Sequence, residues 1–254
     1  TEHLALLCGF ELRYTAMKQN KFENNMPAEK IESQLVDEDE LSLKLIEAQY
    51  LLKNTRDQKN AKSVLVLVNG IELAGKGESV KQLREWVDPR YLRVKADIPN
   101  TFSPKQTFWQ PYAASIPAEG QIMVMFGNWY SDLLVTALQG EKPFDEKLFD
   151  TYVEEMRAFE QDLKNNHVDV IKVWFDLSWK SLQKRLDNMD PSEMHWHKLH
   201  GLDWRNKKQY DNLQKLRQRF TDDWTVIKCE DEQARDQQFA QTILAALENC
   251  PEHL

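Results

Sequence analysis

The sequence has few cysteines, no long apolar run and no excess of basic residues. Its three cysteines, Cys8, Cys229 and Cys250, are far apart and form no CxxC pair, so neither a disulfide framework nor a thiolate zinc site is indicated. No apolar run approaches the roughly 18 residues that a membrane-spanning helix needs. The apolar stretch 4–10 is too short and lacks the basic flank of a signal peptide. We therefore expect a cytoplasmic protein without a membrane partner.

The charge balance of the chain is acidic. The formal net charge is −8 and the sequence pI is near 5.4. This argues against a nucleic-acid partner, because nucleic-acid binding normally needs a basic face that displaces counterions from phosphates. One basic segment, 198–219, is open to two interpretations: a solvated helix face or a local anion-binding patch. Its basic residues are Lys198, Arg205, Lys207, Lys208, Lys215, Arg217 and Arg219.

Apolar runs alternate with helical patterns along most of the chain. Strands that are apolar on both faces are expected at 63–68, 121–126, 168–175 and 224–229. Helical patterns occupy 40–53, 78–87, 129–139, 145–166, 178–188, 204–220 and 231–249. This alternation predicts an α/β fold in three layers, a parallel sheet flanked by helices. Its 254 residues and 41% hydrophobic content suit one domain, expected at 37–254 after a poorly defined N-terminal extension at 1–36.

The most informative stretch is AKSVLVLVNGIELAGKGESVKQLREW, residues 61–86. It contains GxxxxGK, the Walker A or P-loop pattern, directly after a buried strand and at the start of a helix. In such a loop, backbone N–H groups and the helix N-terminus face a phosphate, and the lysine reaches between phosphates. The pattern assigns phosphate binding to Gly70, Gly75, Lys76 and Gly77, although Gly77 stands where the usual loop has Ser or Thr for Mg²⁺. The alternative is a glycine-rich turn packed closely on the sheet.

Several segments together resemble the polyphosphate kinase 2 family. They are NGIELAGKGESVKQLREWVDPR (69–90), PAEGQIMVMFGNWY (117–130), FEQDLKNNHVDVIKVWFDLS (159–178), LDWRNKKQYDN (202–212) and DEQARD (231–236). The resemblance covers about residues 40–250. It is strongest to the first of two fused domains in the polyphosphate:AMP phosphotransferase class.

This resemblance implies a P-loop kinase-like fold with a helical lid, and transfer of a phosphoryl group between inorganic polyphosphate and an adenine nucleotide. It also implies Mg²⁺, a homo-oligomer and a fused second domain. Glu72 and Lys76 would be catalytic, with Glu72 as the metal ligand. Lys198, Arg205, Lys207 and Lys208 would bind phosphate in a basic channel.

The sequence departs from the family pattern mainly at charged positions. Glu72 replaces an aspartate of the loop, and FGNWYSD replaces a motif that resembles DRSWYxR. Phe126 therefore takes the position of a metal-binding aspartate, whereas Gly127 and Asp132 take those of two arginines. Gln110 replaces another arginine, and Lys198 is the only permanent cation of the lid segment 186–204.

These departures leave two hypotheses for function. One is a polyphosphate-dependent nucleotide phosphotransferase; because phosphoryl transfer depends on cancelling negative charge, we expect this domain alone to have weak or no catalysis. The other is a non-catalytic structural or regulatory pseudo-domain that supports an active partner domain. An ordinary ATP-dependent small-molecule kinase fits less well, because AGKG replaces GK[ST].

Three further features have ordinary interpretations beside functional ones. His195, His197 and His200 suit a lid or plain surface loop better than a metal site, because no nearby carboxylate or cysteine completes a ligand set at standard spacing. The tryptophans suit packing or base stacking, with Trp174 expected in the core. Asp176 follows a strand and suits a helix N-cap better than a metal ligand.

Overall fold

The computed structural model describes residues 35–56, 61–97, 99, 107–139, 145–190 and 202–248. These residues belong to one compact unit, Leu35–Leu254. Lys198, the three lid histidines and most of the expected N-terminal extension lie outside the described residues.

A five-stranded parallel sheet in the order β2-β3-β1-β4-β5 forms the centre of the unit. Its strands are β1 (Ser63–Gly70), β2 (Leu92–Ala96), β3 (Ile122–Phe126), β4 (Val168–Asp176) and β5 (Thr225–Lys228). The predicted parallel sheet is confirmed, and four of its strands were expected. Sequence reasoning missed β2, an edge strand in which only Leu92 is buried and charged side chains interrupt the apolar pattern.

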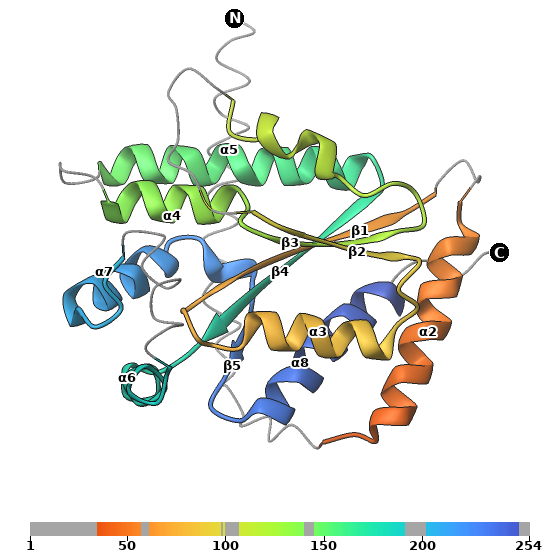
Figure 1. The fold of residues 1–254 in the computed structure, drawn as a ribbon. Coiled ribbons are helices and arrows are strands. Elements are labelled where there is room, and N and C mark those ends of the chain that lie inside the picture. The colour runs from red at the N-terminus through yellow and green to blue at the C-terminus, as the bar shows by residue number, and fades with distance from the viewer. Residues whose placement is uncertain are drawn as a thin grey trace, which may run out of the picture. The chain divides into compact units, whose positions relative to one another are not determined.

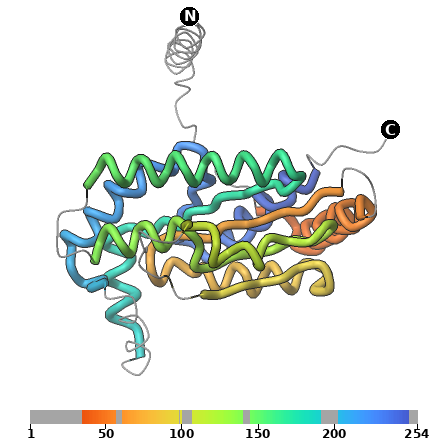
Figure 2. Tube along the Cα trace, turned by 90° about the horizontal axis from the view of Figure 1, so that it is seen from above, coloured from red at the N-terminus to blue at the C-terminus, as the bar shows by residue number. Residues whose placement is uncertain are grey.

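Helices cover both faces of the sheet (Figure 1). Helices α4 and α5 lie on one face, and α2, α3 and α8 on the other. Helices α6 and α7 lie toward the carboxyl ends of the strands in both views (Figures 1 and 2). The bounds are α2 Glu38–Asn54, α3 Lys76–Trp86, α4 Trp129–Gln139, α5 Glu146–Asn165, α6 Trp179–Asp187, α7 Lys207–Arg217 and α8 Glu232–Glu248, with 3-10 turns η1 Gln110–Ser115 and η3 Thr221–Asp223. Among the described helices, none has the length and apolarity to cross a bilayer.

The strand order places the candidate loop at the centre of the sheet. Strand β1 lies between β3 and β4, and the chain builds one side of the sheet before it crosses to the other. In open α/β sheets, such a reversal leaves a crevice at the carboxyl ends of the strands, where ligands bind. The loop that leaves β1 at Gly70 opens onto this crevice.

A buried lysine joins the sheet to its covering helices. Lys172 of β4 is buried, and its ammonium lies 2.7 Å from a carboxylate oxygen of Glu160 in α5. Trp129, at the start of α4, donates its indole N–H to the other oxygen of Glu160 at 3.0 Å. The packing interpretation of Trp129 is confirmed, because the residue is fully buried. The charge on Lys172 is paired, as a buried charge must be.

Gly70 ends β1 in direct contact with the backbone of β4. Its φ is 144°, and a Cβ at this position would lie 2.2 Å from the carbonyl oxygen of Phe175. No side chain fits there without moving one of two central strands. Gly77, in the first turn of α3, has nothing within 4 Å of its Cβ position.

We expect Gly70→Ala to lower the free energy of unfolding by about 2–5 kcal/mol, through backbone strain and overpacking. The matched Gly77→Ala variant should be neutral or more stable by up to about 1 kcal/mol, because alanine favours the helix. Urea unfolding of both variants measures the difference. Equal stability of the two variants would contradict the close packing at Gly70.

Candidate functional site

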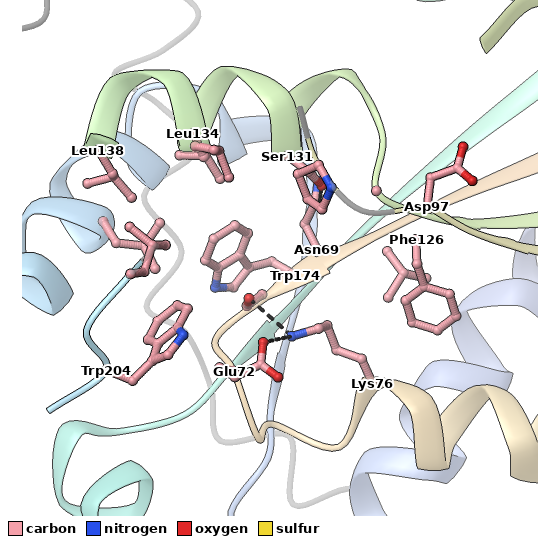
Figure 3. Close-up of a pocket in the computed structure, with 17 residues that line it drawn as sticks. Asn69, Glu72, Lys76, Asp97, Phe126, Ser131, Leu134, Leu138, Trp174 and Trp204 are labelled. Atoms are coloured by element: carbon pink, nitrogen blue, oxygen red, sulfur yellow. Dashed lines mark hydrogen bonds and ion pairs between the residues drawn. The ribbon is translucent and has the colours of Figure 1, made fainter. Parts of the chain in front are cut away.

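The loop between β1 and α3 brings the main predicted residues together. Gly70, Glu72 and Lys76 line one pocket of about 240 Å³, at the carboxyl ends of the strands (Figure 3). Gly75 is the N-cap of α3, which begins at Lys76 as the sequence predicts. Gly75 and Gly77 belong to the loop and first turn but do not line the pocket.

The ammonium group of Lys76 is engaged by the loop itself. It donates to the backbone carbonyl oxygen of Ile71 at 2.7 Å and to that of Gly70 at 3.3 Å. A carboxylate oxygen of Glu72 lies 3.9 Å away, and Figure 3 shows the lysine side chain turned back toward this group. The side chains of Lys76 and Glu72 are only 20% and 27% exposed. A phosphate that used this lysine would have to compete with these oxygens.

Two arginines from other helices contact the loop between β1 and α3. Arg185 of α6 donates to the carbonyl oxygen of Leu73 at 2.6 Å and to that of Cys229 at 2.5 Å. Arg235 of α8 is 2% exposed, donates to Ser79 at 2.9 Å, and occupies the space that a Cβ on Gly75 would need. Neither arginine was singled out from sequence. The only signal for Arg235 was its place in DEQARD, one of the segments that carry the family resemblance.

The end of β3 lacks the charged groups that the resemblance implies. Phe126 and Gly127 line the pocket. Gly127 has φ 63°, and a Cβ there would lie 2.1 Å from the backbone oxygen of Asp97, so an arginine does not fit this backbone. Asp132 is buried and accepts a 2.5 Å hydrogen bond from the Tyr112 hydroxyl. Burial and then this carboxylate raise the pKa of Tyr112 well above its ordinary value. These three positions therefore contribute no cation to the pocket.

Neutral polar side chains link β1 to the start of α4. Asn69 donates its amide to the side-chain oxygen of Asn128 at 3.0 Å and accepts from the Ser131 hydroxyl at 2.5 Å. The same oxygen of Asn128 accepts from the backbone N–H of Tyr130 at 3.1 Å. This network orients α4 without adding charge beside the loop.

The predicted basic channel is only partly described. Arg205 pairs with Asp187 at 2.8 Å and donates to the carbonyl oxygen of Leu186. Lys207 pairs with Asp211, and Lys208 is exposed at the start of α7. None of these three residues lines the pocket that contains Lys76. Lys198 lies outside the described residues, so its predicted role, like theirs, stays a prediction.

Asp176 is not a helix cap, and the interpretation as an N-cap was wrong. Asp176 is the last residue of β4, and Ser178 caps α6 by accepting from the N–H of Ser181. The carboxylate of Asp176 instead accepts from Gln214 at 3.1 Å and lies 3.4 Å from Arg217. Two intervening residues carry the chain from the strand to the helix, and this places the cap at Ser178.

The described residues contain no cluster of three His, Cys, Asp or Glu side chains that could hold a metal ion. Glu72 and Asp97 line the same pocket, and each is paired with a lysine, at 3.9 Å to Lys76 and 2.8 Å to Lys95. Mg²⁺ is often bound by one or two carboxylates together with substrate phosphates. Glu72 would therefore be a partial ligand that depends on phosphate oxygens from the substrate.

The fold and the loop define the class of protein. A parallel sheet with a GxxxxGK loop between β1 and α3 is a P-loop α/β fold of the kinase type. The family described as Polyphosphate kinase 2 (PPK2) matches residues 32–253, and the chain belongs to this family.

Individual relatives agree with this assignment. The chain is 72% identical to a polyphosphate:AMP phosphotransferase from Acinetobacter johnsonii, over 90% of this chain and 48% of that protein. It is 34% identical to a polyphosphate:AMP phosphotransferase from Pseudomonas aeruginosa, over 82% of this chain and 42% of that protein. The chain thus spans about half the length of these curated relatives. The crystal structure of a polyphosphate kinase 2 from Arthrobacter aurescens TC1 has the same fold, with a TM-score of 0.69 at 22% identity, over 85% of this chain and 80% of that one.

Cys229 lies directly behind the loop as a buried thiol. It is fully buried, and burial raises its pKa from 9.0 to about 12, although the charges of Arg235, Lys76 and Arg185 act in the opposite direction. The pKa of this thiol is higher in the folded chain than in the unfolded chain. The stability that the buried, neutral thiol contributes is therefore fully present below pH 9 and is lost as the pH rises toward 12.

We therefore expect the stability of the wild-type chain to fall more steeply between pH 9 and pH 11 than that of a Cys229→Ala variant. Urea unfolding at a series of pH values measures this difference, and the variant corrects for the titration of lysines and tyrosines. Parallel pH profiles for the two chains would contradict the buried, neutral thiol.

Proposed function

We propose that this chain is the polyphosphate kinase 2-like unit of a polyphosphate:AMP phosphotransferase, and that this unit alone transfers phosphoryl groups weakly or not at all. The full protein would use inorganic polyphosphate and an adenine nucleotide, in a cytoplasmic homo-oligomer with a fused second domain. The names of the relatives at 72% and 34% identity support the substrates, and their greater length supports the second domain. The domain limits 37–254 are part of the same proposal.

The state of Lys76 is the observation that carries this proposal. Its ammonium is held by two backbone carbonyls and Glu72, and the neighbouring positions Phe126, Gly127 and Asp132 add no cation. Phosphoryl transfer depends on positioning and on cancelling the charge of the transferred group. Loss of one transition-state donor typically costs about 10²–10³ in rate, so the absence of two arginines and a metal-binding aspartate would lower the rate by several orders of magnitude.

A structural or regulatory role for the unit is the second candidate. The favouring observation is that the packing around the loop is complete although the pocket has few cations. Trp129 and Tyr130 of FGNWYSD are fully buried. Arg185 and Arg235 contact the loop. Such a unit would support an active partner domain. Mg²⁺ enters the proposal only for a unit that turns over, with Glu72 as its one loop ligand.

The direct test is phosphoryl transfer from long-chain polyphosphate to AMP and ADP by this chain with Mg²⁺. We expect rates at or close to the no-enzyme background for the wild-type chain, and little or no further change in Lys76→Ala. The matched control is Lys81→Ala, which removes an exposed lysine of the same helix. Thermal unfolding by circular dichroism verifies that each chain is folded. Wild-type turnover in the range of typical kinases, about 1–100 s⁻¹, that Lys76→Ala abolishes and Lys81→Ala retains would overturn the proposal.

A further inference from the structure

The outer face of α2 carries most of the exposed apolar side chains. Among the described residues, eight large hydrophobic side chains are exposed, and five of them belong to residues 35–51. Leu43 and Leu51 are 57% and 61% exposed, and Tyr50 is 37% exposed. The inner side of the same helix packs on α3 and α8, and α2 lies at the edge of this layer (Figure 1). Single exposed apolar residues are common, but a cluster of them indicates an interaction surface.

Tyr50 is held in its exposed position by its neighbours. Its hydroxyl donates to a carboxylate oxygen of Asp88 at 3.1 Å and accepts from Arg90 at 3.1 Å. The ring of Tyr91 packs edge-on against it, with 5.9 Å between the ring centroids, and the Lys53 ammonium lies 5.7 Å from the Tyr50 ring. A side chain that is already fixed loses little conformational freedom on association. Tyrosines of this kind are common anchor residues in protein interfaces.

The two ends of α2 carry charges of opposite sign. The first turn contains Glu38, Asp39 and Glu40, and the last turn contains Lys53. A parallel pair of such helices would bring like charges together, whereas an antiparallel pair places the acidic end of each helix against the basic end of the other. In a twofold-symmetric pair, every such contact occurs twice. The charge distribution therefore favours a second copy of this chain as the occupant of the exposed face.

The spacing of residues along α2 gives such a pair a consistent register. Leu43 and Tyr50 are seven residues apart, and Asp39 and Lys53 are fourteen apart, so all four lie along one side of the helix. In an antiparallel pair centred near Ile46, Leu43 of one copy faces Tyr50 of the other. Asp39 of one copy then faces Lys53 of the other. The result is an apolar centre with an ion pair at each end.

We propose that the outer face of α2 is the contact between two copies of this chain, which pack antiparallel about a twofold axis. Leu43 and Tyr50 form the apolar centre of this contact, and Asp39 and Lys53 form its charged rim. The inference rests on the homo-oligomer of the proposed function and assigns a surface to it.

Sedimentation equilibrium of the full chain over a range of concentrations tests this assignment. We expect the wild-type chain to reach the mass of two chains of 29.9 kDa each. Leu43→Lys places a charge in the apolar centre and should raise the dissociation constant of the dimer at least about tenfold. The matched control is Leu148→Lys, because Leu148 is an exposed leucine of α5, on the other face of the sheet. It should leave the dissociation constant unchanged, and thermal unfolding verifies that both variants are folded.

A charge exchange tests the antiparallel arrangement. Asp39→Lys places like charges opposite each other at both ends of the contact and should weaken the dimer at least about fivefold. The double variant Asp39→Lys, Lys53→Glu restores opposite charges and should recover most of the wild-type affinity. A double variant no tighter than Asp39→Lys alone overturns the antiparallel register.

Failure of the inference is distinguishable from failure of the proposed function. A monomeric wild-type chain overturns the inference and leaves α2 to another occupant, such as the additional sequence of the longer relatives. A dimer that Leu43→Lys does not weaken overturns the assigned surface and leaves a homo-oligomer standing. Turnover at typical kinase rates that depends on Lys76 refutes the proposed function, whatever the mass of the chain.

Discussion

The contact between the Lys76 ammonium and the oxygens of its own loop determines how the rest of the site is organised. Lys76 donates to the carbonyls of Gly70 and Ile71 and faces Glu72. These contacts lie within the loop, and Arg185 donates a further hydrogen bond to the carbonyl oxygen of Leu73. In the proposed account, the charge of Lys76 stabilises the conformation of the loop and does not bind phosphate. On this account, the loop contacts satisfy the ammonium without an anion, so an anion would add little.

The packing of the sheet and the charge at the end of β3 are determined by different contacts. Gly70 is in close contact with Phe175, which lets β1 and β4 pair up to the loop, and Trp129 is buried in the core. At Gly127, a side chain would clash with the backbone of Asp97. The carboxylate of Asp132 accepts a hydrogen bond from Tyr112. An arginine at Gly127 would require movement of the backbone near Asp97. The absence of a cation at these two positions therefore follows from the backbone conformation as well as from the residue types.

The sequence predicted most of the strands and helices, but it did not predict the contacts of the side chains in the candidate site. The apolar runs of β1 and β4 predicted buried parallel strands. Strand β2 was not predicted, because an edge strand that contains Arg93 and Lys95 has no apolar run. GxxxxGK located Lys76, but spacing cannot reveal that its ammonium turns back onto Ile71. Arg235 and Trp204 reach the loop and pocket from distant segments, and tertiary packing alone brings them there.

Anion binding at Lys76 tests the central claim most directly. Tripolyphosphate is titrated, without magnesium, into the wild-type chain and into Lys76→Ala, and the two dissociation constants are compared. The account predicts weak binding that differs by less than about threefold, because the ammonium is already satisfied by its own loop. Wild-type binding at least about tenfold tighter than that of the variant would show a lysine available to phosphate, and would contradict the account.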